Sequence, residues 1–324
     1  MENKIIKKIE QANLLGRGGA SFPTYKKWQA VKQISAKHKY IVCNCSEGEP
    51  GVFKDGFILK NYPDQVINGL KVALKTIDKS QAYLYLRKDY YRRFSAKLKK
   101  LSKNLPITVI RESGGYLAGE ETSVCEEIEG RVGKPRQKPP FPSQEGIFGC
   151  PTLINNLETF YMISQISQNK YQDTRFYSLS GHVKKPGVYE LPINWSIKRI
   201  LKETSNWPEH DFFMQIGGGA SGEILLDTEA NKKVGGSGAI VVFDRKKTDP
   251  YVLMKKWAQF FLEQNCDKCV PCREGVYRIF EMLKQKQLDP KTLEDLFLVL
   301  DQSSYCALGR MVIVPFRSLI KKVL

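Results

Sequence analysis

Four cysteines near the end of the chain have the spacing of metal ligands. Cys266, Cys269 and Cys272 form two C-x-x-C steps that share their middle cysteine, and Cys306 follows downstream. Three thiolates on one tight loop, joined by a fourth from elsewhere, are the ligand set that a 4Fe–4S cluster needs. Four thiolates would also bind zinc, although zinc sites usually pair two separate C-x-x-C knuckles. The spacing therefore predicts an electron-transfer site and leaves zinc as the alternative.

A glycine-rich segment near the start of the chain could hold an anionic or planar ligand. Gly16, Gly18 and Gly19 allow backbone N–H groups to approach such a ligand closely. This is not the Rossmann fingerprint, which follows a strand and needs a third glycine where Ser21 stands. A plain glycine-rich turn is the alternative interpretation.

A second glycine turn, at residues 113–119, opens a predicted helix with Glu120 and Glu121 in or near its first turn. Because the helix dipole favours carboxylates at that end, capping alone would explain both residues. The polar and proline-rich run at 129–142 and the segment 155–159 are expected to be loops that shape a site or bind a partner.

Alternating strand and helix patterns indicate how these loops are positioned. Apolar periodicity predicts helices at about 3–15, 66–77 and 88–103. Short strands are expected at 40–44, 82–86 and 107–110. This alternation is typical of a parallel α/β sheet, which carries its ligand contacts at the carboxyl ends of the strands.

The pattern changes in the second half of the chain. From about residue 171, glycine turns separate strand-like segments around a helix at about 195–204, and the last 75 or so residues look helical. A helical bundle could bring Cys306 back to the other three cysteines. We therefore expect three domains, which would cover residues 1–170, 171–248 and 249–324.

Composition sets further bounds. The chain has 324 residues, 42% of them hydrophobic, which is ordinary for a soluble globular protein of two or three domains. No apolar run approaches the roughly 20 residues of a membrane helix, and no signal peptide precedes the first helix. We expect a cytoplasmic protein without direct membrane insertion, at most peripheral to a membrane complex. The net charge of +17 is spread widely and no reader motif accompanies it, so nucleic-acid binding is not expected.

Several long motifs carry a family resemblance. They are GRGGASFPTYKKW (16–28), CNCSEGEPGVFKDG (43–56), GGYLAGEETS (114–123), EGRVGKPRQKPPFP (129–142), NNLET (155–159), SGHVKKPGVYELP (180–192) and CDKCVPCREG (266–275). In this order they resemble the NADH- and flavin-binding subunit of respiratory complex I. The diaphorase subunits of NAD-linked hydrogenases and formate dehydrogenases are similar, and the sequence does not choose among these.

The resemblance implies an FMN- and NADH-binding domain, a small ubiquitin-like module and a helical 4Fe–4S domain. The positions that match the flavin pocket are Gly16, Arg17, Gly18, Gly19, Lys27, Asn44, Glu47, Gly119, Glu120, Asn155, Asn156 and Thr159. Those that match the NADH side are Phe22, Glu49, Tyr116, Glu121 and Phe141. The cluster ligands would be Cys266, Cys269, Cys272 and Cys306.

The chemistry of these side chains is compatible with the assigned roles. Lys27 can offset phosphate charge, and the rings of Phe22 and Phe141 can stack on adenine, although core packing is the alternative for both rings. Glu121 can accept a ribose hydroxyl and would repel a 2′-phosphate, which favours NADH over NADPH. The family usually has Asp where Ser46 stands and Gly where Ser21 stands. These two departures motivate a rival interpretation, in which the chain is an iron–sulfur scaffold that has lost flavin turnover.

The resulting expectation is an NADH dehydrogenase module. A hydride would pass from NADH to FMN, and single electrons would then pass to the cluster and on to an iron–sulfur partner subunit. No protein acid, base or nucleophile is needed, and Glu47 and Glu49 are candidates for tuning the flavin and nucleotide affinities. A zinc-stabilised basic protein that binds nucleic acid is a third, less favoured interpretation.

Overall fold

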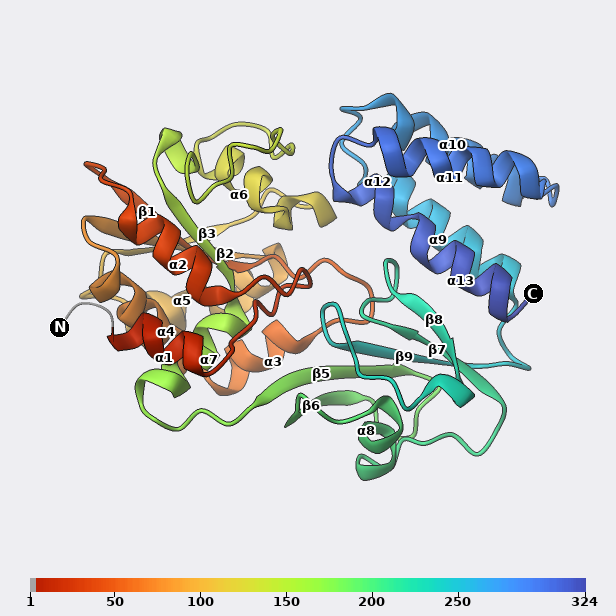
Figure 1. Cartoon of the computed structure of the whole chain (residues 1–324), viewed down its shortest axis with the longest axis horizontal. Coiled ribbons are helices and arrows are strands. Elements are labelled where there is room, and N and C mark those ends of the chain that lie inside the picture. The colour runs from red at the N-terminus through yellow and green to blue at the C-terminus, as the bar shows by residue number, and fades with distance from the viewer. Residues whose placement is uncertain (1–3) are drawn as a thin grey trace. The chain divides into compact units, whose positions relative to one another are not determined.

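The computed structural model describes residues 4–324, which divide into two compact units (Figure 1). Unit 1 comprises Met1–Gly48 and Phe53–Phe176, and unit 2 comprises Glu49–Val52 and Tyr177–Leu324. The helix expected at 3–15 starts at a position outside the described residues. Its observed part, α1, spans Lys4–Gln11 and ends before residue 15, and Asn13 has a φ of +47°, which is not helical. The three-domain division stays a prediction.

A four-stranded parallel sheet forms the centre of unit 1. Its order is β3-β2-β1-β4. The strands are β1 (Lys39–Cys45), β2 (Ser80–Leu86), β3 (Ile107–Arg111) and β4 (Thr152–Asn156). The first three confirm the strands expected from the sequence. The fourth strand corrects the expectation of a loop at 155–159, because Asn155 and Asn156 are the last two residues of β4.

Helices cover both faces of this sheet. On one face, Tyr40 and Val42 of β1 pack in one cluster with Val124 and Cys125 of α6. On the other, α4 and α7 contact β1. The helices of unit 1 are α1, α2 (Thr24–Gln33), α3 (Lys54–Asn61), α4 (Pro63–Thr76), α5 (Lys88–Leu101), α6 (Glu121–Ile128) and α7 (Leu157–Ser167), with 3-10 turns η1 (Tyr116–Gly119) and η2 (Ile147–Gly149). Coverage of both faces explains why β1 is apolar and buried along almost its whole length.

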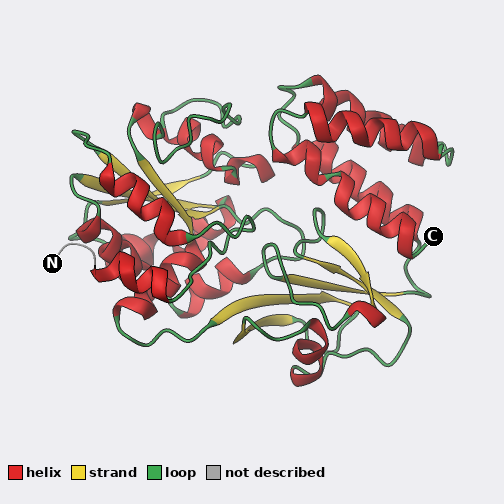
Figure 2. Ribbon diagram, viewed as in Figure 1, coloured by secondary structure: helices red, strands yellow, loops and turns green. Residues whose placement is uncertain are grey.

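Unit 2 combines a mixed five-stranded sheet with helices, which Figure 2 draws in yellow and red. The sheet has the order β6-β5-β9-β7-β8; β5 and β9 run parallel, and β7 is antiparallel to β8 and β9. The strands are β5 (Thr174–Gly181), β6 (Gly187–Pro192), β7 (Phe212–Ile216), β8 (Glu223–Leu226) and β9 (Ala239–Asp244). Helix α8 (Ile197–Glu203) packs its buried face into the core of this sheet, and η3 (Asp227–Glu229) follows β8.

The last part of unit 2 is helical, as expected. It consists of α9 (Pro250–Gln264), α10 (Val270–Lys284), α11 (Pro290–Ser303), α12 (Ala307–Met311) and α13 (Ile313–Lys322). Its core is aromatic, since the Phe316 ring lies 5.7 Å from that of Trp257 and 6.1 Å from that of Phe297. The predicted α/β fold with a second small sheet and a helical C-terminal region is thus confirmed. Among residues 4–324, no helix has the length and apolar character needed to cross a membrane.

Candidate functional site

The glycine-rich segment of unit 1 is a closed loop between α1 and α2. Leu15 and Pro23 form an antiparallel bridge, and the Gly16 N–H donates to the Phe22 carbonyl at 2.9 Å. At its tip Gly19 has a φ of +114°, and a Cβ there would meet no atom within 4 Å. Backbone groups at the tip are therefore open to a ligand. Gly18 brings the loop to the end of β4, because its Cβ would lie 3.3 Å from the Asn156 Cβ.

Arg17 and Thr159 anchor this loop. The Arg17 N–H donates to the Thr159 hydroxyl at 3.0 Å, and its guanidinium donates to the Thr174 carbonyl at 3.2 Å. Both residues are buried, with Arg17 3% and Thr159 0% exposed. Both residues were predicted to belong to the flavin pocket. The Arg17 guanidinium, however, points into the protein, where it supports the loop.

Asparagine side chains meet at the carboxyl edge of the sheet. Asn44 on β1 pairs in register with Asn156 on β4. The Asn44 amide donates to the Gly119 carbonyl at 2.8 Å, which ties β1 to the turn before α6. The neighbouring Asn155 side chain points toward Trp28, because its amide oxygen Oδ1 accepts the Trp28 indole N–H at 3.0 Å. The edge of the sheet therefore presents Asn44 and Asn156, as α/β ligand sites require.

A buried charge cluster, which the sequence analysis missed, lies beside these asparagines. The Lys54 ammonium lies 2.6 Å from an Asp55 oxygen, 3.1 Å from a Glu158 oxygen and 3.0 Å from the Asn156 amide oxygen. Lys54, Asp55 and Glu158 are all at most 2% exposed. Charges this deeply buried persist only when paired. They hold α3 and the start of α7 against the end of β4.

Glu47 completes the charge cluster from the β1–α3 loop. Its carboxylate accepts the Asp55 backbone N–H at 3.0 Å and the Tyr90 hydroxyl at 2.7 Å. Burial and the adjacent Asp55 carboxylate raise the pKa of Glu47 to about 7, against the opposing effect of Lys54. A buried carboxylate whose pKa is raised in this way is a candidate for tuning a redox cofactor.

Glu120 and Glu121 have different roles at the start of α6. The Glu120 carboxylate accepts the backbone N–H groups of Thr122 and Ser123 at 2.9 and 3.0 Å, so it caps the helix, as the alternative interpretation proposed. Glu121 pairs with Lys27 at 2.9 Å and lies 3.5 Å from Lys138, which bonds Glu120 more closely, at 2.9 Å. Burial would raise the pKa of Glu121, but these two ammonium groups hold it below its usual value.

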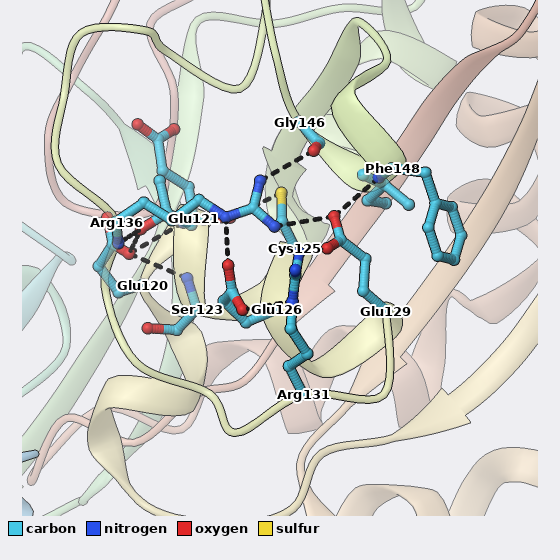
Figure 3. A network of polar contacts seen from close by, with 12 residues as sticks. Glu120, Glu121, Ser123, Cys125, Glu126, Glu129, Arg131, Arg136, Gly146 and Phe148 are labelled. Atoms are coloured by element: carbon cyan, nitrogen blue, oxygen red, sulfur yellow. Dashed lines mark hydrogen bonds and ion pairs between the residues drawn. The ribbon is translucent and has the colours of Figure 1, made fainter.

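Arg136 connects helix α6 to the proline-rich segment that follows it (Figure 3). Its guanidinium pairs with Glu126 and Glu129 of the helix end and donates to the Gly146 carbonyl at 2.9 Å. Glu129 in turn accepts the Phe148 backbone N–H at 2.7 Å. This set of bonds fixes both ends of the segment between Arg136 and Gly146, which includes the predicted NADH residue Phe141.

The predicted NADH residues differ in their surroundings. Phe22 and Phe141 are 47% and 50% exposed, so core packing does not account for either ring. Tyr116 lies against Gly48, whose Cβ would come within 3.2 Å of the ring. The Glu49 carboxylate belongs to unit 2, where it accepts the backbone N–H groups of Ala220 and Ser221, both at 2.9 Å. The assignment of these residues to NADH stays a prediction.

The residues of unit 1 fit a flavin mononucleotide. The tip of the glycine loop has open space beside Gly19, and a side chain at Gly18 would fill the gap between loop and sheet. The Asn44 amide can bind a hydroxyl and Lys27 can face a phosphate, whereas the Asn156 amide is already bonded to Lys54, Asp55 and the Glu158 N–H. The predicted flavin positions all belong to unit 1, so the structure brings them into one compact body.

The four cysteines lie together in the helical part of unit 2. Cys266 precedes α10, Cys269 is its N-cap, Cys272 lies in its first turn, and Cys306 is the N-cap of α12. Burial and then the nearby thiols of Cys269, Cys306 and Cys266 raise the pKa of Cys272 to about 12. A thiol so perturbed is neutral unless a metal binds it and displaces the proton.

The two candidate metal centres need different arrangements of the thiols. Within the described residues 4–324, no three His, Cys, Asp or Glu side chains converge closely enough to bind one metal ion. Zinc would need four thiolates at about 2.3 Å from one centre, whereas a cubane cluster distributes its four thiolates over four irons. Beside Cys272, the buried hydroxyl of Ser304 has no hydrogen-bond partner within that same range, and Gly309 leaves the space that a side chain would take.

Known proteins match both halves of this arrangement. Residues 9–165 match the Nuo51 FMN-binding domain, and residues 252–323 match the NADH-ubiquinone oxidoreductase-F iron–sulfur binding region. An NADH-quinone oxidoreductase F subunit of Rhizobium meliloti, the one numbered 2, is 32% identical over 366 aligned residues, which cover 98% of this chain and 86% of that protein. The corresponding protein of Aquifex aeolicus is 34% identical over 326 residues, covering 90% of this chain and 76% of that protein.

A solved structure extends the match to the fold. The crystal structure of an NAD+-reducing NiFe-hydrogenase in the H2-reduced state superposes with a TM-score of 0.91 at 28% sequence identity. The match covers 98% of this chain, and this chain spans 61% of the length of the hydrogenase chain.

A flavin-binding α/β unit and a four-cysteine iron–sulfur region on one chain define an iron–sulfur flavoprotein. More particularly, the chain belongs to the family of NADH-quinone oxidoreductase F subunits. The family resemblance and the predicted cofactors, FMN and a 4Fe–4S cluster, are thereby confirmed, and the zinc alternative is set aside. The roles of individual site residues stay predictions.

Proposed function

We propose that this chain is the NADH-oxidising module of a larger redox assembly. The observation that carries the proposal is the presence, on one chain and in the family's order, of an FMN-binding region and an iron–sulfur region. Bound FMN would supply the chemistry, because a flavin accepts a hydride and can release electrons singly. The protein supplies binding, orientation and electrostatics.

The residues of unit 1 have distinct tasks in this scheme. The glycine loop and the asparagines at the sheet edge would hold the flavin, while the exposed rings of Phe22 and Phe141 would stack on the nucleotide. Glu121, kept ionised by Lys27 and Lys138, would accept a ribose hydroxyl. In unit 2, the four thiolates would bind the cluster that receives the electrons.

A partner must take the electrons onward, since the chain has a single predicted cluster site. The relatives are named as subunits of an NADH-quinone oxidoreductase, and the solved match belongs to a hydrogenase, so both kinds of relative imply partner subunits. We propose an iron–sulfur partner subunit and a place on the cytoplasmic side, peripheral to any membrane complex.

An anaerobic NADH titration of the reconstituted protein tests the proposal, with NADPH as the control nucleotide. Bleaching of a flavin band, followed by loss of the broad iron–sulfur absorbance, is the expected result. A cluster that dithionite reduces and NADH does not would overturn the proposal and support the scaffold that has lost flavin turnover.

The charge on Glu121 predicts the nucleotide preference. Replacement of Glu121 by Gln removes the repulsion of a 2′-phosphate and should raise kcat/KM for NADPH relative to NADH by about tenfold, which corresponds to roughly 1.4 kcal/mol. Steady-state kinetics with an artificial acceptor measure this ratio for both nucleotides. An unchanged ratio would show that Glu121 does not face the ribose.

A further inference from the structure

The loop after β1 has an unusual polar pair that the proposed function does not yet use. The Ser46 hydroxyl donates a hydrogen bond to the carboxylate of Glu112, the residue that follows β3. Glu112 is only 4% exposed. Burial raises the pKa of Glu112, whereas hydrogen bonds from the Ser46 hydroxyl and the Lys88 backbone N–H and the charge of Arg87 favour the ionised carboxylate. Burial of a carboxylate costs free energy unless hydrogen bonds or opposite charges compensate for it.

The pair lies directly beside predicted flavin-pocket residues. A Cβ on Gly119 would come within 3.2 Å of the Ser46 hydroxyl oxygen and 2.8 Å of its carbonyl oxygen. The Ser46 N–H donates to the Asn44 side chain at 3.1 Å, and Asn44 itself donates to the Gly119 carbonyl at 2.8 Å. Glu112, Ser46, Asn44 and Gly119 therefore form one connected polar network within unit 1.

Ser46 itself carries no charge. The structure shows a carboxylate next to it, contributed by Glu112 across the carboxyl edge of the sheet. An Asp at position 46 would place two carboxylates within hydrogen-bonding reach, and two such groups cannot both ionise without strong repulsion. Ser46 and Glu112 are thus compatible as a pair, whereas Asp at position 46 and Glu112 are not.

We propose that Glu112 is a positioning residue of the FMN site, which orients the Ser46 hydroxyl and places a negative charge beside the predicted flavin-pocket residues Asn44 and Gly119. This inference rests on the proposed function. Because the Ser46 hydrogen is held by Glu112, the Ser46 oxygen would be available to accept a hydrogen bond at this end of the sheet.

A double-mutant cycle tests this coupling on the full-length protein with its cluster in place. The variants are Ser46→Asp, Glu112→Ala and the double variant Ser46→Asp/Glu112→Ala. The FMN dissociation constant is measured by quenching of flavin fluorescence. Each single change should weaken FMN binding by about 10- to 100-fold, because the first sets two carboxylates against each other and the second removes the charge and the acceptor for Ser46. The double change restores one carboxylate and should return the dissociation constant to within about tenfold of wild type.

The flavin midpoint potential is the second readout, because a purely structural role would not move it. Glu112→Gln keeps a hydrogen-bond acceptor for Ser46 and removes only the charge, so it should raise the potential. A tenfold change in the ratio of affinities for reduced and oxidised flavin corresponds to about 30 mV for two electrons. The control is Glu10→Gln, which changes an exposed carboxylate of the same unit. Its effect should add to that of Ser46→Asp without coupling.

The outcomes separate this inference from the proposed function. Iron–sulfur absorbance in every variant shows that unit 2 is intact, and far-UV circular dichroism reports whether the chain is folded. Folded Glu112→Ala and Glu112→Gln proteins with unchanged FMN affinity and potential would overturn the role of Glu112, as would a strictly additive cycle. If wild-type protein itself fails to bind FMN, the proposed function fails first.

Discussion

Glu47 provides the sharpest test of the site's electrostatics. Its pKa is raised from 4.5 to about 7 by burial and by Asp55. Between these values the folded protein binds a proton that the unfolded chain does not, so this group's stabilising contribution is full below about pH 4.5 and is lost as the pH rises through 7. At 1.36 kcal/mol per pKa unit, the 1.5 units between pH 5.5 and 7 correspond to about 2 kcal/mol.

The variant Glu47→Gln removes this titration and retains an oxygen that can accept the Asp55 N–H. On going from pH 5.5 to pH 8, the wild-type protein should lose about 2 kcal/mol more stability than the variant does. For a unit of this size, that is roughly 4–8 °C in the unfolding midpoint. Release of flavin fluorescence on heating reports on unit 1 and measures the midpoint. Titrations common to both proteins cancel in the comparison.

The control for Glu47 is Glu10→Gln, which changes an exposed carboxylate of the same unit. Its pH dependence should follow that of wild type. If Glu47→Gln and wild type lose the same stability between pH 5.5 and pH 8, then Glu47 is not protonated near neutral pH, and the account of the buried charge cluster is wrong.

Two further predictions concern residues that position the site. Replacement of Arg136 by Lys cannot reproduce its bonds to Glu126, Glu129 and the Gly146 carbonyl. It should raise the KM for NADH about tenfold, or roughly 1.4 kcal/mol, with little change in kcat, and a fall in kcat alone would contradict a role in nucleotide binding. Replacement of Ser304 by Ala removes a buried hydroxyl beside Cys272 that is free to donate to the cluster. A lost hydrogen bond of about 1 kcal/mol should lower the cluster potential by roughly 40 mV in an EPR-monitored titration, and an unchanged potential would refute the contact.

The parts of the fold with strong periodicity could be predicted from the sequence. Strands β1, β2 and β3 are short apolar runs between helical segments, and their order along the chain implies a parallel sheet. Strand β4 was missed because it has five residues and ends in Asn155 and Asn156, which are typical of loops. Its position next to β1 depends on a crossover of more than a hundred residues, which no local pattern reveals.

The same holds for the site residues: those with a local sequence signal could be predicted, and the others could not. The cysteine spacing and the glycine loop indicate ligands directly, because each feature is local in sequence. Lys54 and Glu158 carry no such signal, since their ion pair joins residues about a hundred positions apart. The clue that could have found Lys54 is its place in the motif CNCSEGEPGVFKDG, where a lysine follows an apolar pair at the start of a helix.

The composition of the buried charge cluster bears on why the protein retains it. Lys54 pairs with both Asp55 and Glu158, and the Arg17 guanidinium lies farther away, 3.9 Å from Glu158. Glu47 adds a third carboxylate, which bonds the Asp55 backbone. Buried ionic groups of this kind are costly, and an apolar replacement would often be more stable. Burial first, and then the Asp55 carboxylate, raises the pKa of Glu47, and Lys54 offsets this only in part. The cluster lies at the sheet edge beside Asn156, where a ligand of an α/β protein binds, so the tuning of a bound cofactor is the role that we predict for it.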